Sequence, residues 1–241
     1  MLPFYGLSMG RIEIEKNPLL VRAMFGRIAL RYDRLNRMMT LGQDLRWRKE
    51  VVQRAAIPSS GRVLDLGTGT GDLALEVVRY TPAVQVVAAD FALPMMQVGR
   101  RGKPAIIRWC AADALSLPFP SESFDAVVSG FLLRNVADLE RSLSEQYRVL
   151  RTGGKWVSLD TTPPRPNLLL PFIMFHLNFV IPALGRWIAG DGAAYHYLPQ
   201  TTQSFLSAEE LAELLRKVGF CQVGFCRRMF GTVAIHWGRK G

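Results

Sequence analysis

Apolar and polar positions alternate regularly over the middle of the chain. Arg62–Leu66 is a short apolar run that ends in glycines, and Val84–Ala89 is β-branched and apolar, as in a buried strand. Between these runs, Asp72–Tyr80 follows a helical period. This alternation of strands and helices predicts βαβ units around a parallel sheet. The same pattern predicts strands at Ile106–Cys110, Ala126–Ser129 and Trp156–Leu159, and helices at Pro94–Gly102 and Leu139–Leu150, the second of which stops at Gly153-Gly154.

The C-terminal part of the chain predicts a helix followed by a hairpin. Ser207 and, three residues later, Glu210 form a capping box at the start of the helix, which ends at Gly219. Two strand-like runs, Cys221–Cys226 and Thr232–Trp237, close the chain around a short link. They predict an antiparallel hairpin at one edge of the sheet.

The N-terminal part predicts a basic amphipathic helix. Asn17 is a good N-cap, and Pro18 suits the first helical position. Two interpretations of this helix stay open: a solvated charged face over a core-packed helix, or a helix that lies on a membrane surface or over an active site. We expect residues 1–57 to form a helical cap over the active site. One face of the helix carries Leu20, Met24 and Ile28, and another carries Arg27, Arg31 and Arg34.

The segment Leu168–Gly185 is unusually apolar and lies between two predicted strands. A membrane span needs about 20 apolar residues, and this segment is shorter and interrupted by prolines and polar side chains. A span is therefore not expected. A buried insertion helix is one interpretation, and a lid that lines an apolar pocket or dips into a bilayer interface is the other. Residues 161–205 are predicted as this apolar insertion or lid.

The composition fits one folded domain, predicted over residues 1–241. Of the 241 residues 49% are hydrophobic, which is enough to bury a sizeable core. Three cysteines and three histidines, at spacings unlike those of metal ligands, argue against a disulfide framework and a metal site. The cysteines are interpreted as buried or idle thiols in a reducing compartment. The formal net charge of +10 indicates an anionic partner, either nucleic acid or an anionic membrane.

A glycine-rich loop after the first predicted strand carries the strongest chemical signal. Gly67, Gly69 and Gly71 let the backbone turn tightly and approach a ligand closely. Their spacing differs from the GxGxxG pattern of nicotinamide enzymes, and no lysine follows as in a phosphate-binding loop. An acidic residue, Asp65, lies inside the strand just before the glycines.

Acidic residues also follow the next two predicted strands. Asp90 ends the second strand, where a carboxylate can accept hydrogen bonds from both ribose hydroxyls of an adenosine ligand. Asp113 and Ala114 follow the third strand, where they can flank an adenine ring. Each acid alone could be a solvated loop residue. Together they lie where open α/β sheets bind ligands, at the carboxyl ends of the strands.

These residues and several further motifs carry a resemblance to a known family. The glycine loop, Asp90 and Asp113 resemble class I S-adenosylmethionine-dependent methyltransferases. The longer motifs resemble the UbiE/MenG/COQ5 family, whose members C-methylate quinol precursors of ubiquinone and menaquinone. The resemblance implies a Rossmann-like seven-stranded α/β sheet, mostly parallel with an antiparallel C-terminal edge hairpin, and S-adenosyl-L-methionine as cofactor. The family motifs are Leu133-Arg134-Asn135-Val136, Tyr147-Arg148-Val149-Leu150-Arg151-Thr152-Gly153-Gly154 and Ala194-Tyr195-His196-Tyr197-Leu198-Pro199.

The resemblance also implies roles for single residues. The positive charge of Arg134 can lower the pKa of a substrate phenol, although the same residue could instead be the partner of a carboxylate. Asn135 can orient the substrate, and Tyr195 could also be a simple wall residue of the pocket. The candidates for work on the substrate are Arg134, Asn135, Tyr32 and Tyr195, with His196 and Asp160 as further candidates for proton transfer. The candidates for cofactor binding are Gly67, Gly69, Thr70, Gly71, Asp90, Asp113, Ala114 and Gly130.

The expected activity is C-methylation of a polyprenyl quinol precursor, either demethylmenaquinol or a 2-polyprenyl-methoxy-benzoquinol. The polyprenyl tail needs an apolar channel, and the arginines of the N-terminal helix suit an anionic bilayer surface. We therefore expect a cytoplasmic enzyme that is peripheral at the inner face of the cell membrane, and consider a homodimer. The alternatives are a phospholipid or other lipid methyltransferase, a nucleic-acid or protein methyltransferase, and a membrane-surface protein without activity. Nucleic acid is the less favoured partner, because no RNA-binding module is appended.

Overall fold

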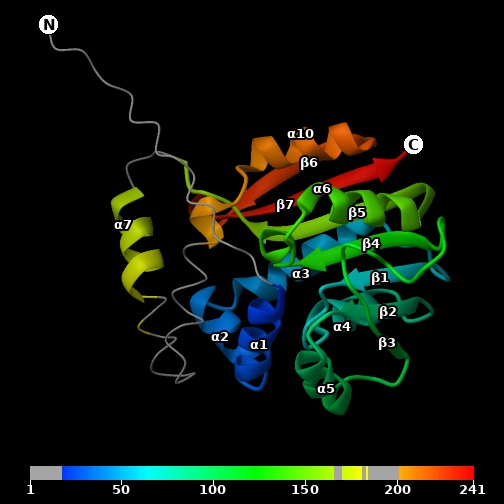
Figure 1. Cartoon of the computed structure of the whole chain (residues 1–241), viewed down its shortest axis with the longest axis horizontal. Helices are drawn as coiled ribbons and strands as arrows, with labels where there is room; N and C mark the ends of the chain where they lie inside the picture. The colour runs from blue at the N-terminus through cyan, green and yellow to red at the C-terminus, as the bar shows by residue number, and fades with distance from the viewer. Residues whose placement is uncertain (1–17, 166–169, 181–182, 184–200) are drawn as a thin grey trace, which may run out of the picture.

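A seven-stranded sheet forms the centre of the molecule, and helices cover both of its faces (Figure 1). The computed structural model describes residues 18–165, 170–180, 183 and 201–241. The strands are β1 (Arg62–Leu66), β2 (Gln85–Asp90), β3 (Ile107–Ala111), β4 (Phe124–Gly130), β5 (Leu150–Thr161), β6 (Phe220–Arg228) and β7 (Val233–Lys240). Their order in the sheet is β3-β2-β1-β4-β5-β7-β6. The first five are parallel, whereas β7 is antiparallel to both β5 and β6, which confirms the predicted sheet and its antiparallel edge hairpin.

The helices of the described residues include most of those predicted from the sequence. The longer ones are α1 (Pro18–Ile28), α2 (Tyr32–Met39), α3 (Gln43–Ala55), α4 (Asp72–Tyr80), α5 (Leu93–Gly102), α6 (Leu139–Val149) and α10 (Ala208–Val218). The short helical segments are η1 (Leu133–Asn135), α7 (Leu170–Phe175), η2 (His176–Val180) and η3 (Met229–Gly231).

The apolar core has two halves, one on each face of the sheet. Successive residues of a strand point to opposite faces, so Val63 of β1 packs with α3 and α4 while Leu64 packs with α6 and α10. Both residues are fully buried, as expected for a strand in the centre of a parallel sheet. This arrangement brings the carboxyl ends of β1, β2 and β4 to one edge, where the connecting loops lie side by side.

Two predicted element boundaries are wrong. The N-terminal helix ends at Ile28, so Arg31 lies in a turn and Arg34 lies on the next helix, α2. The helix predicted over residues 139–150 also ends differently. Helix α6 ends at Val149, and the chain continues at once as strand β5 through Gly153 and Gly154. Leu150 is fully buried and pairs with Phe124 of β4, so sheet pairing begins before the two glycines. The glycines lie where the register between β4 and β5 shifts, and Gly153 has a φ of 81°. The two glycines therefore allow the register shift within strand β5 and do not end the helix.

Local signals at the C-terminal helix are confirmed. The Ser207 hydroxyl accepts a hydrogen bond from the Glu210 N–H at 3.2 Å, and the Glu210 carboxylate accepts one from the Ser207 N–H at 2.7 Å. Gly219 ends α10 with a φ of 115°, in the left-handed region. Capping groups of this kind satisfy the free N–H and C=O groups that every helix end leaves behind.

The N-terminal helices pack against the start of α5. Met24 and Ile28 of α1 are buried as the apolar pattern predicts, whereas Leu20 is 68% exposed because the first turn of α1 extends beyond the core. A Cβ atom added to Gly26 would lie 3.3 Å from Pro94, which shows how closely α1 passes α5. Within the described ranges, no helix combines the length and the apolar character that a membrane span requires.

The apolar segment and the cysteines differ from some of the interpretations above. Among the described residues of 168–185, Ile173 is buried, but Phe172, Phe175 and Phe179 are exposed, so a buried insertion helix is wrong for this part. The three cysteines are free and at least partly exposed, so they are not buried thiols.

Candidate active site

The glycine loop between β1 and α4 takes a shape that side chains would obstruct. Gly67, Gly69 and Gly71 all have positive φ angles, between 57° and 84°. A Cβ atom on Gly67 would lie 2.7 Å from Leu132 Cδ1, and one on Gly71 would lie 2.5 Å from Trp109. The loop backbone is therefore packed closely between its neighbours, as the spacing of the glycines predicts.

The buried carboxylate of Asp65 holds this loop in place through two hydrogen bonds. Its Oδ2 accepts hydrogen bonds from the Thr68 hydroxyl at 2.5 Å and from the Ala74 N–H at 2.9 Å. The residue is fully buried, and burial raises the pKa of its carboxyl group to about 6. The other oxygen, Oδ1, is also buried and has no hydrogen-bond partner, which leaves an acceptor for a ligand or a water.

Asp90 joins the glycine loop to the start of α5. Its Oδ2 accepts a hydrogen bond from the Gly69 N–H at 2.6 Å, and its Oδ1 accepts one from the Ala92 N–H at 2.7 Å. Burial raises the pKa of this carboxyl group, although the backbone hydrogen bonds oppose the shift. Asp90 lies at the end of β2, so its free lone pairs remain at the carboxyl edge of the sheet.

A cavity opens at this edge, between the strand ends and the N-terminal helices. Asp113 lines it, and its Oδ1 accepts a hydrogen bond from the Leu115 N–H at 2.9 Å, which shapes the turn after β3. The strand ends contribute Leu66, Gly67, Gly69, Asp90, Phe91, Ala92, Ala112, Asp113, Ala114, Leu115, Gly130, Phe131, Leu132, Asn135, Val136 and Ala137, and α1, α2 and α5 contribute Val21, Arg22, Phe25, Tyr32 and Met95.

The helical wall of the cavity is aromatic and carries one cation. The rings of Phe25 and Tyr32 meet edge to face, with centroids 5.8 Å apart. The Arg22 guanidinium lies 5.3 Å from the ring centroid of Phe91, on the loop after β2. This cation–π contact joins α1 to the opposite wall of the cavity.

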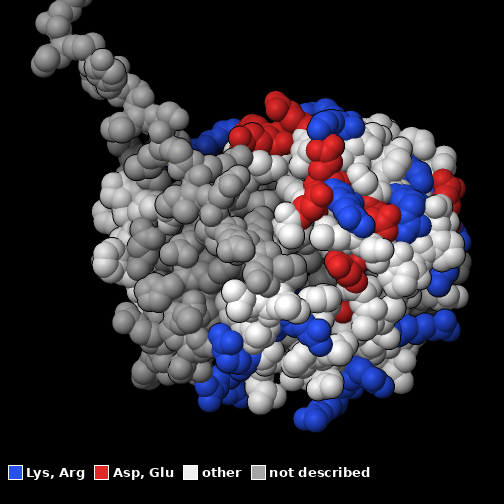
Figure 2. All heavy atoms as spheres, in the orientation of Figure 1, with Lys and Arg blue, Asp and Glu red and all other residues white. Residues whose placement is uncertain are grey.

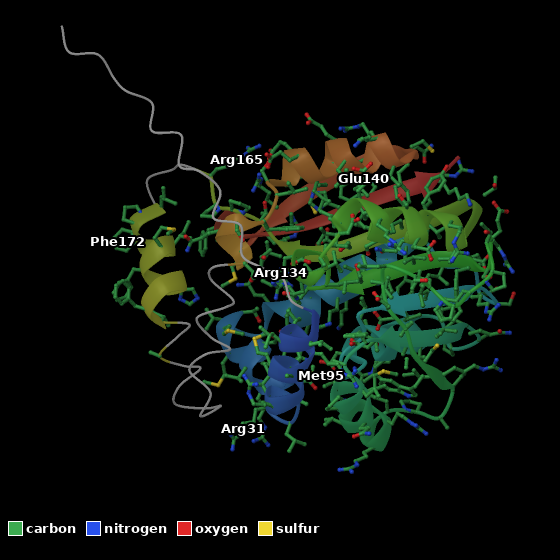
Figure 3. The ribbon with its side chains drawn as sticks, in the orientation of Figure 1. Arg31, Met95, Arg134, Glu140, Arg165 and Phe172 are labelled. Atoms are coloured by element: carbon green, nitrogen blue, oxygen red, sulfur yellow. The ribbon has the colours of Figure 1, made fainter. Side chains whose placement is uncertain are left out.

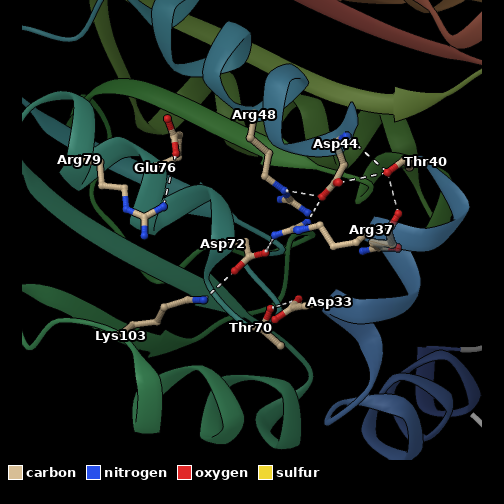
Figure 4. A network of polar contacts seen from close by, with 11 residues as sticks. Asp33, Arg37, Thr40, Asp44, Arg48, Thr70, Asp72, Glu76, Arg79 and Lys103 are labelled. Carbon is tan, nitrogen blue, oxygen red and sulfur yellow. Dashed lines mark hydrogen bonds and ion pairs between the residues drawn. The ribbon is translucent and has the colours of Figure 1, made fainter. Parts of the chain in front are cut away.

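A network of polar contacts fastens α2 and α3 to the glycine loop (Figure 4). The Thr70 hydroxyl donates a hydrogen bond to Asp33 of α2 at 2.7 Å. Asp72, at the start of α4, pairs with Arg37 at 2.6 Å and with Lys103 at 2.6 Å. Burial alone would raise the pKa of Asp72, but hydrogen bonds and nearby cations outweigh it and lower the pKa. The ionised carboxylate thus connects the N-terminal helices to α4 and α5.

Arg37 also contacts the buried carboxylate of Asp44, to which Arg48 lies at 3.6 Å. The Arg48 side chain is 8% exposed, and its Nε has no hydrogen-bond partner. It lines a small second cavity together with Asp65, and this cavity shares Gly67, Gly69, Gly130 and Tyr32 with the first one. A Cβ atom on Gly130 would lie 3.5 Å from Arg48 Nη1.

Arg134 is not among the described residues that line the cavity. Its Nη1 donates a hydrogen bond to Asp160 Oδ1 at 2.6 Å, and its backbone N–H donates to Asp160 Oδ2 at 3.3 Å. Both side chains are buried, at 5% and 2% exposure. The geometry therefore favours Arg134 as the partner of a carboxylate, the second of the two interpretations above. Asn135 does line the cavity, and its buried Oδ1 has no partner.

Most of the residues predicted for the site meet at this edge. Gly67, Gly69, Asp90, Asp113, Ala114, Gly130, Tyr32 and Asn135 line the main cavity, whereas Thr70, Gly71 and Arg134 lie behind its lining. Tyr195 and His196 lie outside the described residues. The sequence pattern missed Phe25 of α1 and Arg48 of α3, because residue type and helical period do not show which helix packs over the strand ends. The described residues contain no cluster of side chains that could hold a metal ion.

The fold and this edge of the sheet are those of a class I S-adenosylmethionine-dependent methyltransferase. A solved SAM-dependent methyltransferase from Thermotoga maritima, described as a possible histamine N-methyltransferase, matches with a TM-score of 0.63 and 21% identity over 91% of this chain and 99% of that chain. A Haemonchus contortus phosphoethanolamine N-methyltransferase 2, solved with S-adenosyl-L-methionine, matches with a TM-score of 0.62 and 16% identity over 81% of this chain and 52% of that chain.

The chain belongs to the ubiE/COQ5 methyltransferase family, whose model matches residues 12–240. It is 49% identical over 221 residues to the ubiquinone/menaquinone biosynthesis C-methyltransferase UbiE of Desulfotalea psychrophila, covering 91% of this chain and 90% of that relative. It is 44% identical over 220 residues to the demethylmenaquinone methyltransferase of Thermus thermophilus, covering 90% of this chain and all of that relative. The resemblance seen in the sequence motifs is thereby confirmed.

Proposed function

We propose that this chain transfers a methyl group from S-adenosyl-L-methionine to a ring carbon of a polyprenyl quinol, in the biosynthesis of menaquinone or ubiquinone. One observation carries the proposal: a single cavity joins the glycine loop and Asp90 to an apolar wall built by α1, α2 and the loop after β4. Relatives at 44–49% identity are named as methyltransferases of these two quinones. None of the described residues that line the cavity favours a phospholipid headgroup or a nucleic acid as acceptor.

The residues present fit the cofactor. Each oxygen of Asp90 accepts one backbone hydrogen bond and keeps a lone pair that a ribose hydroxyl can use. On the other side of the loop, Asp65 Oδ1 is an acceptor without a hydrogen-bond partner, and the Arg48 guanidinium, whose Nε lies 3.6 Å from Asp44, lines the same small cavity. An acceptor and a donor set together complement the ammonium and carboxylate groups of an amino acid. When bound, the cofactor supplies a methyl group activated by a positively charged sulfur.

The acceptor side suits an ionisable aromatic ring. A quinol ring carbon would become nucleophilic when a neighbouring hydroxyl loses its proton to solvent, and the new carbon–carbon bond would form as the carbon–sulfur bond breaks. The methylated ring carbon would then lose its proton while the ring oxygen regains one, which restores the aromatic quinol, so that one proton is released overall. Asn135 Oδ1 is available to accept a hydrogen bond from a ring hydroxyl, and the Tyr32 phenol can orient the second one. Phe25 and Phe131 exclude water from the reacting atoms.

A methyl-transfer assay tests this function. Purified protein is incubated with S-adenosyl-L-methionine and chemically reduced demethylmenaquinol in detergent, and the quinone is analysed by mass spectrometry. We expect a product one methyl group heavier on the ring. Parallel reactions contain a 2-polyprenyl-methoxy-benzoquinol or phosphatidylethanolamine. Methylation of phosphatidylethanolamine alone, or of neither quinol by protein that binds the cofactor, would contradict the proposal.

A pair of neighbouring residues on α1 provides a sharper test of the acceptor wall. Val21 lines the cavity, whereas Leu20 is 68% exposed and is not among the described residues that line it. Val21→Glu places a charge against the apolar tail, so we expect a higher KM for the quinol and an unchanged Kd for the cofactor. Leu20→Glu is the matched control and is expected to leave both values unchanged.

A further inference from the structure

Three phenylalanines project outward from the segment α7–η2. Phe172, Phe175 and Phe179 are 73%, 59% and 63% exposed, and the rings of Phe175 and Phe179 stack at 5.3 Å. Figure 3 shows Phe172 on the side of α7 that faces away from the sheet. Ile173 is buried against Met39 of α2, so the segment is attached to the N-terminal helices by its inner face. The outer face is left apolar and accessible.

The end of α2 continues this apolar surface. Met38 is 41% exposed and Leu41, two residues beyond the helix, is 81% exposed. Arg34 lies four residues before Met38, on the same face of the helix, and is exposed. The contact between Met39 and Ile173 shows that the end of α2 packs against the inner face of α7. We call Met38, Leu41, Phe172, Phe175 and Phe179 together the apolar corner.

The described charges on α1, α2 and the start of α3 are mostly positive. Residues 18–49 contain eight arginines and lysines and two carboxylates, Asp33 and Asp44. Asp44 is completely buried against Arg37, and the Asp33 carboxylate accepts a hydrogen bond from Thr70 of the glycine loop. On the face that Figure 2 shows, Lys and Arg lie over the α1–α2 end of the molecule, whereas Asp and Glu are mixed with Lys and Arg over α6 and α10. Exposed apolar side chains with a cationic surround are typical of surfaces that bind anionic bilayers.

We propose that the apolar corner docks onto an anionic lipid bilayer, with the phenylalanines in the interfacial region and Arg34 against the headgroups. Phe172 and Phe175 lie about one helical turn apart on α7, and the ring of Phe179 on η2 stacks on that of Phe175. In one respect the proposal rests on the proposed function, since a polyprenyl quinol resides in the bilayer. The cavity that receives it has its helical wall on α1 and α2, and α2 carries Met38 of the apolar corner.

Vesicle sedimentation of the full chain, without cofactor or quinol, tests the docking. The vesicles are phosphatidylcholine alone, or phosphatidylcholine with phosphatidylglycerol. Leu41→Asn is compared with Phe230→Asn, because both residues are exposed and apolar and both have a left-handed backbone, with φ of 52° and 55°. We expect Leu41→Asn to weaken binding to the anionic vesicles about tenfold, and Phe230→Asn to leave it unchanged.

A second pair of variants tests the charge. Arg34→Gln removes a cation beside the apolar corner, and Arg101→Gln removes an exposed cation on α5, away from it. We expect only Arg34→Gln to weaken binding, by about fivefold, which corresponds to roughly 1 kcal/mol for one cation at an anionic surface. Added salt should reduce this difference.

The outcomes separate the docking from the proposed function. Failure of the native chain to bind anionic vesicles, or equal binding by Leu41→Asn and Phe230→Asn, would overturn the docking, whatever the methyl-transfer assay gives. A change of oligomeric state in Leu41→Asn by light scattering, with unchanged vesicle binding, would also overturn it in favour of contact between two copies. In turn, Leu41→Asn should methylate a short-tailed quinol in detergent at the native rate, because this residue lies outside the cavity lining.

Discussion

The two walls of the cavity are built in different ways. The sheet wall consists of loops at the ends of β1, β2, β3 and β4, fixed by carboxylates such as the buried Asp65 and the half-buried Asp90. The helical wall consists of side chains on α1 and α2, which pack in a small cluster of Met24, Ile28 and Leu35. Backbone geometry defines the first wall, and side-chain identity defines the second.

The polar network shows how the second wall depends on the first. Among the contacts of α2 to the glycine-loop side are the Thr70–Asp33 hydrogen bond and the Arg37–Asp72 ion pair. A few such contacts can be exchanged for others without rebuilding the sheet. The comparison teaches that the sheet wall is determined by the fold, whereas the helical wall depends on side chains that can vary.

The largest effect is expected at the buried ion pair of Arg134 and Asp160. Arg134→Ala leaves the buried Asp160 without its cation, and we expect a loss of about 3–5 kcal/mol in the free energy of unfolding. Replacing both residues by Arg134→Met and Asp160→Leu should recover most of this loss, because no buried charge then remains. Urea unfolding measures both values. Native stability with lost turnover in Arg134→Ala would instead support a direct role of Arg134 on the substrate.

The second effect is a dependence of the free energy of unfolding on pH, which we expect from His236 in the sheet. His236 is buried on β7, and its Nε2–H donates to the Ala208 carbonyl at 2.9 Å, which leaves Nδ1 without a partner. Burial lowers the pKa of His236 to about 4, so between pH 6.5 and 4 the unfolded chain binds a proton that the folded chain does not. Stability should therefore fall by about 3 kcal/mol as the pH drops through this window.

His236→Gln should remove this loss, as measured by urea unfolding at several pH values. Asp65 acts in the opposite direction, because its raised pKa lets the folded chain bind a proton first as the pH falls below about 6. The contribution of Asp65 to stability is the same in the native chain and in His236→Gln, so it cancels when the two pH profiles are subtracted. Parallel pH profiles of the native chain and His236→Gln would contradict the prediction.

The third effect tests how closely the cofactor loop is packed. A Cβ atom on Gly99 of α5 would lie 2.4 Å from the Thr70 carbonyl oxygen, whereas one on Gly102 meets nothing within 4 Å. We expect Gly99→Ala to destabilise the fold by about 1–3 kcal/mol and to weaken cofactor binding. Gly102→Ala is the matched control, and thermal unfolding and calorimetry distinguish the two variants. Equal stability and equal cofactor affinity of the two variants would mean that the glycine loop can shift to accommodate the added methyl group.

The fourth effect separates cofactor affinity from stability. Asp90→Ala removes the acceptor for ribose hydroxyls and frees the Gly69 N–H, so the cofactor Kd should rise about 10- to 100-fold. Asp138→Ala is the control, since Asp138 also accepts a backbone N–H, that of Arg141 at 2.9 Å, but at the start of α6. Calorimetric titration measures both, and an unchanged Kd for Asp90→Ala would exclude the ribose contact.

The smallest effect is expected at the hydrogen bond between Thr70 and Asp33, which connects the helical wall to the sheet wall. Asp33→Ala and Thr70→Val each remove one side of the same hydrogen bond, and each should cost about 0.5–1.5 kcal/mol of stability. Their effects should not add in the double variant, because the bond is already lost in either single one. Additive losses of stability would show that the two residues act independently. Other contacts of the polar network would then connect the two walls.

Much of the sheet wall could be read from the sequence because its signals are local. The glycine loop lies between a strand and a helix that periodicity alone predicts, and Arg62–Leu66 and Asp72–Tyr80 match the observed elements residue for residue. The capping box at Ser207 is equally local. The end of α6 was mispredicted because Leu150 pairs with Phe124, a contact distant in sequence, which outweighs the local preference of two glycines.

The sequence by itself determined the order of strands and helices, the glycine loop and the position of Asp90 at the cofactor edge, since each depends on neighbouring residues. The tertiary structure decided which partner each charged side chain takes. Arg134 turns to Asp160, 26 residues away, and Thr70 binds Asp33, 37 residues away. An arginine or a threonine can pair with many groups, and only packing of distant segments selects one, because an unpaired buried charge or hydroxyl is costly.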